Sequence, residues 1–268
     1  METISSRQNP VVKRFRDVGR GGSRDWMLLD GEHLLDEALT AGVRVDVAAF
    51  ANGMAEGRLA ALAARTARAG TTTIGVTDPV LAAMSPVRQP SGVVALAERR
   101  PATIDEVLER TPPMVLMLSQ VQDPGNVGAI IRAAEACGAT GIVAAEGTAD
   151  PFGWKALRGA MGSTFRLRVA AGHSLADAVG RARAAGLRVF ATAARDGRPL
   201  AACDLRGPSA VLFGGEGHGL SPDLLDASDE RLTVPMRPPV ESLNVAVAAA
   251  LVLYEAARQR EGGRTAPV

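Results

Sequence analysis

The sequence predicts an α/β fold in which a parallel sheet fills the second half of the chain and a smaller α/β unit precedes it. Three largely apolar runs, at 114–119, 187–192 and 210–214, are typical of parallel strands that are buried on both faces. Ala-rich segments with helical spacing lie between such runs, and glycines follow them as stop signals. This alternation indicates a sheet whose ligands bind at the carboxyl ends of its strands.

The first hundred residues form the smaller unit. The segment 31–41 places its leucines at helical spacing, and Gly42 follows as a stop. A second, Ala-rich helix is predicted over 56–69 and ends before Gly70. Short strands are predicted at 26–30, 45–50, 71–76 and 92–97.

Charge and proline mark the end of this unit. Pro101, Pro112 and Pro113 lie with charged residues in a stretch that carries at most a short helix. We therefore predict a first domain at 1–98, a linker at 99–113, a second domain at 114–260 and a flexible tail at 261–268.

The second domain alternates more regularly than the first. A helix over 127–137 follows the apolar strand at 114–119, and Gly138 stops it. The other predicted elements are strands at 141–145, 187–192, 210–214 and 231–236, with helices at 175–185 and 243–258.

Composition excludes several classes of protein. The hydrophobic share of 47% and the charged share of 22% are ordinary for a globular chain. No run approaches the roughly 18 apolar residues of a membrane span, and the start does not resemble a signal peptide, so we expect a cytoplasmic protein. The three histidines and the cysteines Cys137 and Cys203 show no metal-ligand spacing, so no metal is expected. Cys137 lies on the apolar face of a predicted helix, which favours a buried thiol.

Positive charge gathers at the amino terminus, although the net charge of the chain is only +1. Residues 1–24 hold six lysines and arginines against Glu2 and Asp17. The segment is either an arm that follows a phosphate backbone or a solvated helix with long side chains, and both alternatives stay open.

Polar residues follow three of the predicted strands, and the first group is DPGNVGAIIRAAEACG at 123–138. Asn126 or Asp123 is placed to cap the helix, while Arg132 lies off its apolar stripe. Six residues of helix rotate by about 600°, so Asn126 and Arg132 do not share one face. Both side chains are still near enough to the helix start to approach one ligand. Alone, this segment favours a capped helix with a solvent-facing arginine.

The second group is VLFGGEGHGLS at 211–221, a strand that runs into glycine-rich backbone. Glycines allow a backbone to approach a ligand closely. The loop is neither a GxGxxG turn nor a P-loop, and Glu216 repels phosphate, which argues against a phosphate cradle. His218 is assigned no role.

The third group is VPMRPPVESLNVAVAAALVLYEAAR at 234–258. Ser242 or Asn244 is placed to cap the last helix, and the same polar pair is suited to orienting a ligand hydroxyl. The prolines of Arg237-Pro238-Pro239 stiffen the preceding loop.

Together these groups resemble the three motifs of the SpoU-type (TrmH-like) branch of the SPOUT superfamily of RNA ribose 2′-O-methyltransferases. The likeness rests on NVGAIIRAAEACGA, LFGGEGHGLS and VPMRPPVESLNVAVAAALVLYE, in that order. The first domain is similar to the ribosomal-protein L30e-like substrate-binding domain of many members, through NPVVKRFRDV, DGEHLLDEAL and PSGVVAL.

The resemblance implies a deep trefoil knot, S-adenosyl-L-methionine as the cofactor, and a homodimer whose interface uses the last helix and the helix at Asn126. It implies contacts to the cofactor from Thr192, Gly214, Val234 and Leu243. It implies catalytic or positioning roles for Asn126, Arg132, Glu216, Ser242 and Asn244.

Arg132 matches the residue that the family uses near the ribose hydroxyl. An arginine is a poor general base in isolation, because its ordinary pKa lies far above neutral pH and the group is already protonated. We therefore expect Arg132 to bind an RNA phosphate and the ribose, with proton removal dependent on that arrangement. Arg158 is either a further RNA contact or a solvated helix residue.

The resemblance leaves several functions open. A 23S-type ribosomal RNA substrate is favoured over transfer RNA, because an L30e-like domain suits structured RNA that is read by shape and phosphate contacts. A thiostrepton-type resistance methyltransferase shares the same layout. A non-catalytic RNA-binding protein is the alternative from another class.

Overall fold

A computed structural model describes residues 3–52, 57–109, 111–217 and 219–261, and its contacts divide the chain into two compact units. The first unit runs to Arg100 and also contains Phe152–Phe165, a segment that the sequence places in the second domain. The second unit holds Pro101–Pro151 and the chain from Arg166 onward. Of the predicted tail, 262–268 lies outside the described residues.

The first unit is built on a mixed five-stranded sheet with the order β1-β4-β3-β5-β2. Strand β5 pairs antiparallel with both β2 and β3, whereas β4 pairs parallel with β3 and β1. Its elements are β1 (Thr3–Ile4), α1 (Pro10–Gly19), β2 (Trp26–Asp30), α2 (Glu32–Thr40), β3 (Val45–Ala51), α3 (Arg58–Arg68), β4 (Thr72–Val76), α4 (Asp78–Met84), β5 (Val93–Glu98), α7 (Trp154–Ala160) and a 3-10 turn (Ser163–Phe165).

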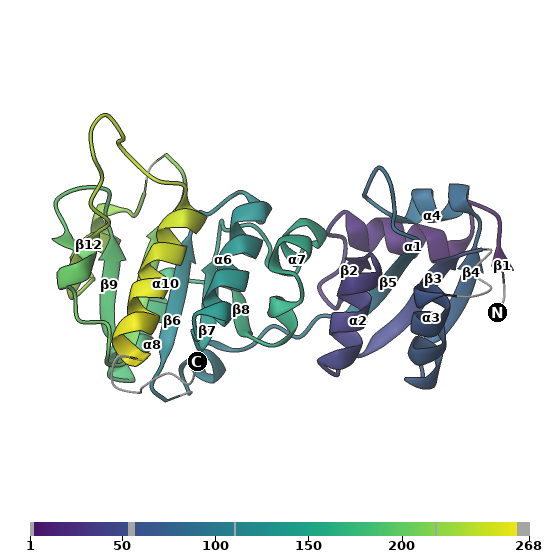
Figure 1. Ribbon diagram of the computed structural model, residues 1–268, viewed down its shortest axis with the longest axis horizontal. Coiled ribbons are helices and arrows are strands. Elements are labelled where there is room, and N and C mark those ends of the chain that lie inside the picture. The colour runs from purple at the N-terminus through teal and green to yellow at the C-terminus, as the bar shows by residue number, and fades with distance from the viewer. Residues whose placement is uncertain (1–2, 53–56, 110, 218, 262–268) are drawn as a thin grey trace. The chain divides into compact units, whose positions relative to one another are not determined.

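Helices α1 and α4 pack against one face of this sheet, while α2 and α3 pack against each other and against neighbouring strands (Figure 1). The core under α1 contains Phe15 and Leu28, which are both fully or almost fully buried. The predicted helices and strands of this unit are all present among the described residues, whereas α1 and α4 are additions to the prediction.

The basic segment 1–24 contains helix α1, and its arginines have partners within the unit. The side-chain oxygen of Asn9 accepts a hydrogen bond from the backbone N–H of Val11, so Asn9 caps the helix. Arg14 donates to Asp46, and the Nε of Arg16 donates to the carbonyl oxygen of Ala83 at 3.2 Å. Much of this charge therefore lies on a folded helix.

Helix α7 explains why Phe152–Phe165 belongs to the first unit. It contacts β2, which is an edge strand of the sheet. Trp154 packs against the core that α1 covers, and Phe152 is buried. An open edge strand is a template for unwanted pairing, and a covering helix removes that hazard.

The second unit is a parallel seven-stranded sheet with the order β10-β12-β9-β11-β6-β7-β8. Its central strands are almost fully buried, as the apolar runs predict. Its elements are α5 (Ile104–Leu108), β6 (Met114–Ser119), α6 (Pro124–Ala136), β7 (Gly141–Ala145), β8 (Arg168–His173), α8 (Leu175–Ala184), β9 (Arg188–Thr192), β10 (Arg198–Pro199), a 3-10 turn (Leu200–Ala202), β11 (Ser209–Gly214), α9 (Pro222–Asp226), β12 (Glu230–Thr233) and α10 (Val245–Glu261).

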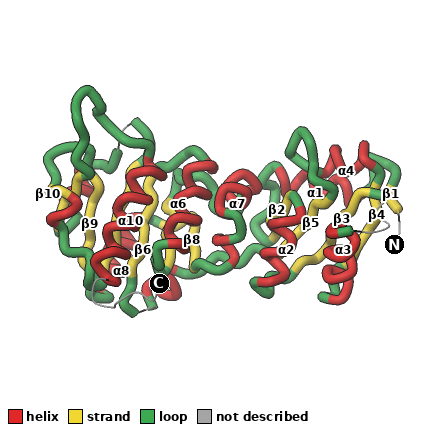
Figure 2. Tube along the Cα trace, in the orientation of Figure 1, coloured by secondary structure: helices red, strands yellow, loops and turns green. Residues whose placement is uncertain are grey.

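Two layers of helices cover this sheet. Helices α5 and α8 bury their apolar residues on one face, and α6 and α10 lie side by side on the other (Figures 1 and 2). Strand β8 was not predicted, and the strand predicted at 231–236 ends at Thr233. The prediction of a buried Cys137 thiol is wrong, because that residue follows the last turn of α6 and is partly exposed.

The last turn of α10 is fastened to two distant segments. The guanidinium of Arg260 donates to the carbonyl oxygens of Leu205 at 2.8 Å, Gly207 at 2.6 Å and Pro113 at 3.2 Å. Burial lowers the pKa of Arg260, but these three acceptors compensate its charge. Helix α10 is therefore anchored at its carboxyl end.

The variant Arg260→Met should lower the free energy of unfolding by about 2 kcal/mol, because charge-assisted hydrogen bonds to partly buried acceptors are lost. Urea unfolding measures the change. The matched control is Arg206→Gln, which removes a surface ion pair with Asp204 and should cost less than about 1 kcal/mol. Equal effects in the two variants would contradict the anchoring role of Arg260.

Candidate functional site

A cavity of about 570 Å³ opens where β9, β11 and β12 end and α10 begins. That volume lies in the range of small-molecule sites, and the position is the one at which open parallel sheets bind ligands. Its walls come from the ends of these three strands, from α9 and from the start of α10. The lining residues used below are Thr192, Gly214, Glu216, Val234, Ser242, Leu243 and Asn244.

One wall of the cavity is backbone that only glycine permits. A Cβ on Gly214 would overlap the backbone of Gly219, and a Cβ on Gly215 would overlap the carbonyl oxygen of Gln120. Gly215 and Gly219 also form an isolated bridge, and Gly219 has a φ of +64°. The loop after β11 therefore folds back tightly on itself and presents main chain to the cavity.

The cavity brings together seven of the nine residues singled out from the sequence. They are Thr192, Gly214, Glu216, Val234, Ser242, Leu243 and Asn244. The hydroxyl of Thr192 donates to the carbonyl oxygen of Leu212 at 2.8 Å, which fixes the end of β9 beside β11. His218 lies outside the described residues.

Three polar side chains from the three motifs form a hydrogen-bonded chain at the rim. The Nδ2 of Asn244 donates to the Oδ1 of Asn126 at 3.1 Å. The Nδ2 of Asn126 in turn donates to a carboxylate oxygen of Glu216. Asn126 thus joins the residues that line the cavity without lining it itself.

The direction of this chain is set by the start of α10. The Oδ1 of Asn244 accepts hydrogen bonds from the backbone N–H groups of Ala246 at 2.9 Å and Val247 at 3.3 Å, so Asn244 caps the helix. The Nδ2 of Asn244 must then point toward Asn126 and donate the hydrogen bond. Asn126 must then offer its oxygen to Asn244 and its nitrogen to Glu216, because a carboxylate oxygen accepts hydrogen bonds.

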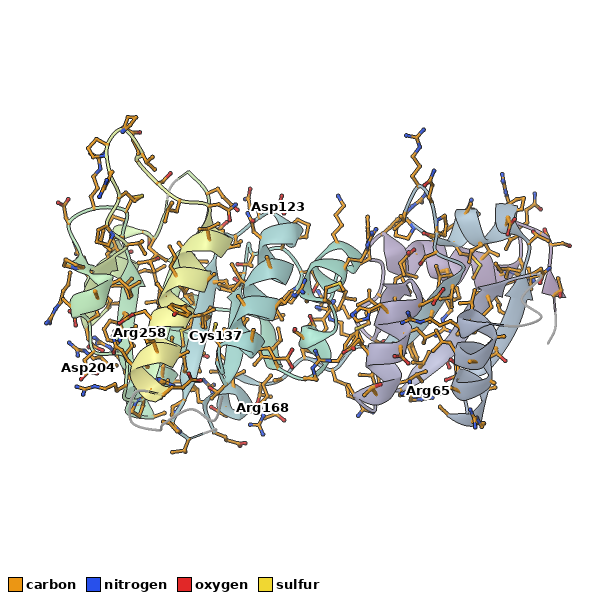
Figure 3. The ribbon with its side chains drawn as sticks, in the orientation of Figure 1. Arg65, Asp123, Cys137, Arg168, Asp204 and Arg258 are labelled. Atoms are coloured by element: carbon orange, nitrogen blue, oxygen red, sulfur yellow. The ribbon has the colours of Figure 1, made fainter. Side chains whose placement is uncertain are left out.

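Arg132 stands apart from this network. It is exposed on α6 and does not line the cavity, and no hydrogen bond or ion pair joins it to another residue of the described ranges. The helix itself is capped by Asp123, whose Oδ1 accepts from the N–H groups of Gly125 at 2.6 Å and Asn126 at 3.2 Å. Figure 3 labels Asp123 at this end of α6. Capping by Asp123 leaves the Asn126 side chain free for its other partners.

The structure adds lining residues that the sequence analysis did not select. Phe213 and Leu220 flank the glycine loop, and Ala248 and Val252 come from successive turns of α10. The spacing of Ala248 and Val252 was a usable signal, because residues four apart on a helix share a face. Phe213 carried no such signal, since a buried strand residue serves equally well in a core.

Two negative observations apply to the described part of the chain. No group of three histidine, cysteine, aspartate or glutamate side chains there is arranged to hold a metal ion. No helix within it has the length and apolar character needed to cross a membrane.

Comparison with known proteins gives a consistent result. The sequence profile of the SpoU rRNA Methylase family matches residues 113–254. The chain is 32% identical, over 95% of its length and 98% of the relative's, to the 23S rRNA (guanosine(2553)-2′-O)-methyltransferase RlmP of Bacillus subtilis.

Solved structures agree over almost the full chain. The AdoMet-bound rRNA methyltransferase of Sinorhizobium meliloti superimposes with a TM-score of 0.86 at 28% identity, covering 99% of both chains. The SpoU methyltransferase AviRb of Streptomyces viridochromogenes, in complex with AdoMet, gives a TM-score of 0.85 at 29% identity, covering 96% of this chain and all of that one. These findings confirm the α/β fold class and the resemblance drawn from the three motifs, and the chain belongs to the SpoU rRNA methylase family.

Proposed function

We propose that the protein transfers a methyl group from S-adenosyl-L-methionine to a ribose 2′-hydroxyl of 23S-type ribosomal RNA. The observation that carries this proposal is the meeting of three separate motifs at one cavity, linked through Asn126, Glu216 and Asn244. Relatives with the same layout are named as 23S rRNA 2′-O-methyltransferases.

The cavity fits the methyl donor. Its volume of about 570 Å³ suits a ligand of that size, and its lining combines apolar side chains with glycine backbone. When bound, the donor supplies an electrophilic methyl group on a positively charged sulfonium. The residues proposed to contact it are Thr192, Gly214, Val234 and Leu243, and all four line the cavity.

The rim residues have different tasks in this proposal. Arg132 binds an RNA phosphate and the ribose, because its exposed guanidinium has no partner within the described chain. The chain from Asn244 through Asn126 to Glu216 shapes the pocket for the reacting nucleotide. Ser242 also lines the cavity, directly before Leu243 and Asn244 in the sequence, and we assign it the task of fixing donor and ribose geometry. Removal of the hydroxyl proton depends on the bound RNA, since an arginine is already protonated at neutral pH and cannot accept a further proton.

Ribosomal RNA is favoured over transfer RNA by two observations. The matched relatives that cover nearly the whole chain include an enzyme named for 23S rRNA. The first unit is a separate α/β body with a basic helix, and we propose that it is an L30e-like domain that binds structured RNA. A ribosomal substrate places the protein in the cytoplasm.

We also propose that the carboxyl-terminal part of the second unit forms the deep trefoil knot expected from the resemblance. Strand β9 lies between β11 and β12, yet α10 follows β12 and packs back on α6 and β11. That return path supports a crossing of the chain. The test is a crystal structure of the protein. A backbone path that would become a straight line if its two ends were pulled apart would contradict the knot.

A homodimer is the third part of the proposal. Three large apolar residues of α10 are exposed at helical spacing, with exposed fractions of 49% for Val247, 41% for Leu251 and 66% for Tyr254. Helix α6 lies beside α10 and adds the exposed Arg132. A self-complementary apolar stripe of this kind suits a two-fold interface, which would bring Arg132 to the boundary between subunits.

Incubation with the donor and in-vitro-transcribed 23S rRNA should yield a 2′-O-methylated nucleoside, detected by digestion and mass spectrometry. Arg132→Ala should reduce the rate at least about a hundredfold, because a positioned charge at the reacting group is lost. Its donor affinity should be unchanged in calorimetry, since Arg132 does not line the cavity. A base-methylated product, a transfer-RNA product only, or no donor binding would contradict the proposal.

Two substitutions of Asn244 should separate capping from orientation. Asn244→Ala removes the cap of α10 and should cost about 1 kcal/mol of unfolding free energy as well as activity. Asn244→Asp keeps a cap oxygen but loses the donor to Asn126, so activity should fall while thermal stability changes little. If the Asn244→Asp variant methylates RNA at the normal rate, the direction of the hydrogen bonds from Asn244 through Asn126 to Glu216 has no role in catalysis.

Leu251→Arg should convert a dimer into a monomer, because it places charge in the apolar stripe of α10. Analytical ultracentrifugation measures the change in mass. Arg258→Gln, which lies on the same helix but pairs with Glu255, is the control that should leave the mass unchanged. A wild-type protein that sediments as a monomer would contradict the homodimer.

A further inference from the structure

Cationic side chains from three separate segments gather at one corner of the first unit, around the loop that joins α4 to β5. Arg16 of α1 reaches this corner, since its Nε donates to the carbonyl oxygen of Ala83 at the end of α4. Arg88 lies in the loop itself and is exposed. Arg16 therefore contacts a residue two positions before Ser85, and Arg88 follows Ser85 by three positions.

A buried carboxyl holds the loop in place and brings α7 to the same corner. Asp30 is only 8% exposed and accepts a hydrogen bond from the hydroxyl of Ser85, which itself accepts from the N–H of Val87 at 3.0 Å. Burial raises the pKa of Asp30, while the Ser85 hydrogen bond and the nearby charge of Arg158 oppose that rise. Arg158 lies on α7, and this helix contacts β2, the strand that ends at Asp30.

Helix α7 contributes a second cation to this corner. Lys155 precedes Arg158 by three residues, so the two side chains are neighbours on the helix surface, and both are exposed. The helix is held firmly, because Trp154 packs against the core under α1. We call Arg16, Arg88, Lys155 and Arg158 together the basic corner.

The basic corner is short of carboxylate partners. No ion pair within 4 Å joins any of its four residues to an acidic side chain in the described ranges, whereas Arg14, on the same helix as Arg16, pairs with Asp46. Lys155 lies 5.5 Å from the ring centroid of Trp154, and Arg16 donates to a carbonyl oxygen, so neither charge is neutralised by a carboxylate. Cations of this kind on three segments are suited to successive phosphates of a polyanion. A folded platform also spares the cost of ordering a flexible arm.

We propose that the basic corner binds the phosphate backbone of the substrate RNA, and that α7 supplies part of the RNA-binding surface of the first unit. Lys155 and Arg158 come from the middle of the methyltransferase sequence, yet they serve the other unit. The proposal rests on the proposed function only for the identity of the polyanion. It extends the RNA-binding surface beyond the amino-terminal hundred residues.

The test is the affinity of the double variant Lys155→Gln/Arg158→Gln for in-vitro-transcribed 23S rRNA, measured by filter binding over a range of salt concentrations without donor. Its Kd should rise about tenfold, and the slope of log Kd against log salt should fall by about 1.5, as expected when two phosphate contacts are lost. Donor affinity and melting temperature should match the wild type.

The matched control is Arg58→Gln/Arg68→Gln, which removes two exposed charges from α3, outside the core that α1 and α4 cover. Its RNA affinity should stay within twofold of the wild type. Equal losses of RNA affinity in the two double variants would mean that only the net charge of the protein matters, and this would contradict the proposal. An unchanged Kd for the Lys155→Gln/Arg158→Gln variant would also overturn it. A wild-type protein that binds RNA through the basic corner but forms no 2′-O-methyl product would refute the proposed function alone.

Discussion

The amide oxygen and the amide nitrogen of Asn244 both make hydrogen bonds, and the arrangement of the polar side chains at the cavity depends on them. Its oxygen is fixed by the free N–H groups at the start of α10, which have no partners within the helix. Its nitrogen must therefore point away and donate to Asn126, which passes the same polarity on to Glu216. The helix cap at Asn244 thus sets the orientation of the Asn126 amide, which is more than a hundred positions away in the sequence.

The cavity and its rim use different kinds of chemistry. The inner wall is main chain at Gly214 and Gly215, with apolar side chains around it, so shape decides what fits. Glu216 and Asn244 add polar groups to the lining, and Asn126 joins them by hydrogen bonds without lining the cavity itself. Arg132 lies on the neighbouring helix α6 and does not line the cavity, so in the function we propose the donor and the ribose are bound by different elements.

Much of this arrangement was predictable from residues alone. The apolar runs at 114–119 and 210–214 could only be strands buried on both faces, and they became the middle of the sheet. Seven of the nine selected residues met at the cavity because the ends of neighbouring parallel strands share an edge. Asn126 and Arg132 remained outside it, since both lie on α6, which packs against α10 and contributes no residue to the lining.

Other features were hidden for physical reasons. Strand β8 is the last in the sheet and only half buried, and its RVAAGH sequence combines small residues with an exposed glycine, so no alternation appears. Helix α1 did leave a signal, because Asn9 and Pro10 are a typical helix start. Its arginines were harder to interpret, since their partners Asp46 and Ala83 are far away in sequence.

The covering of β2 by α7 has a consequence for protein synthesis. The amino-terminal hundred residues leave the ribosome long before Phe152–Phe165, so β2 emerges with an open edge. Strands β6 and β7 of the second unit are made during that interval. The first unit therefore completes its fold only after two of the seven strands of the second sheet have been translated, and its exposed edge must avoid other nascent strands until α7 is made.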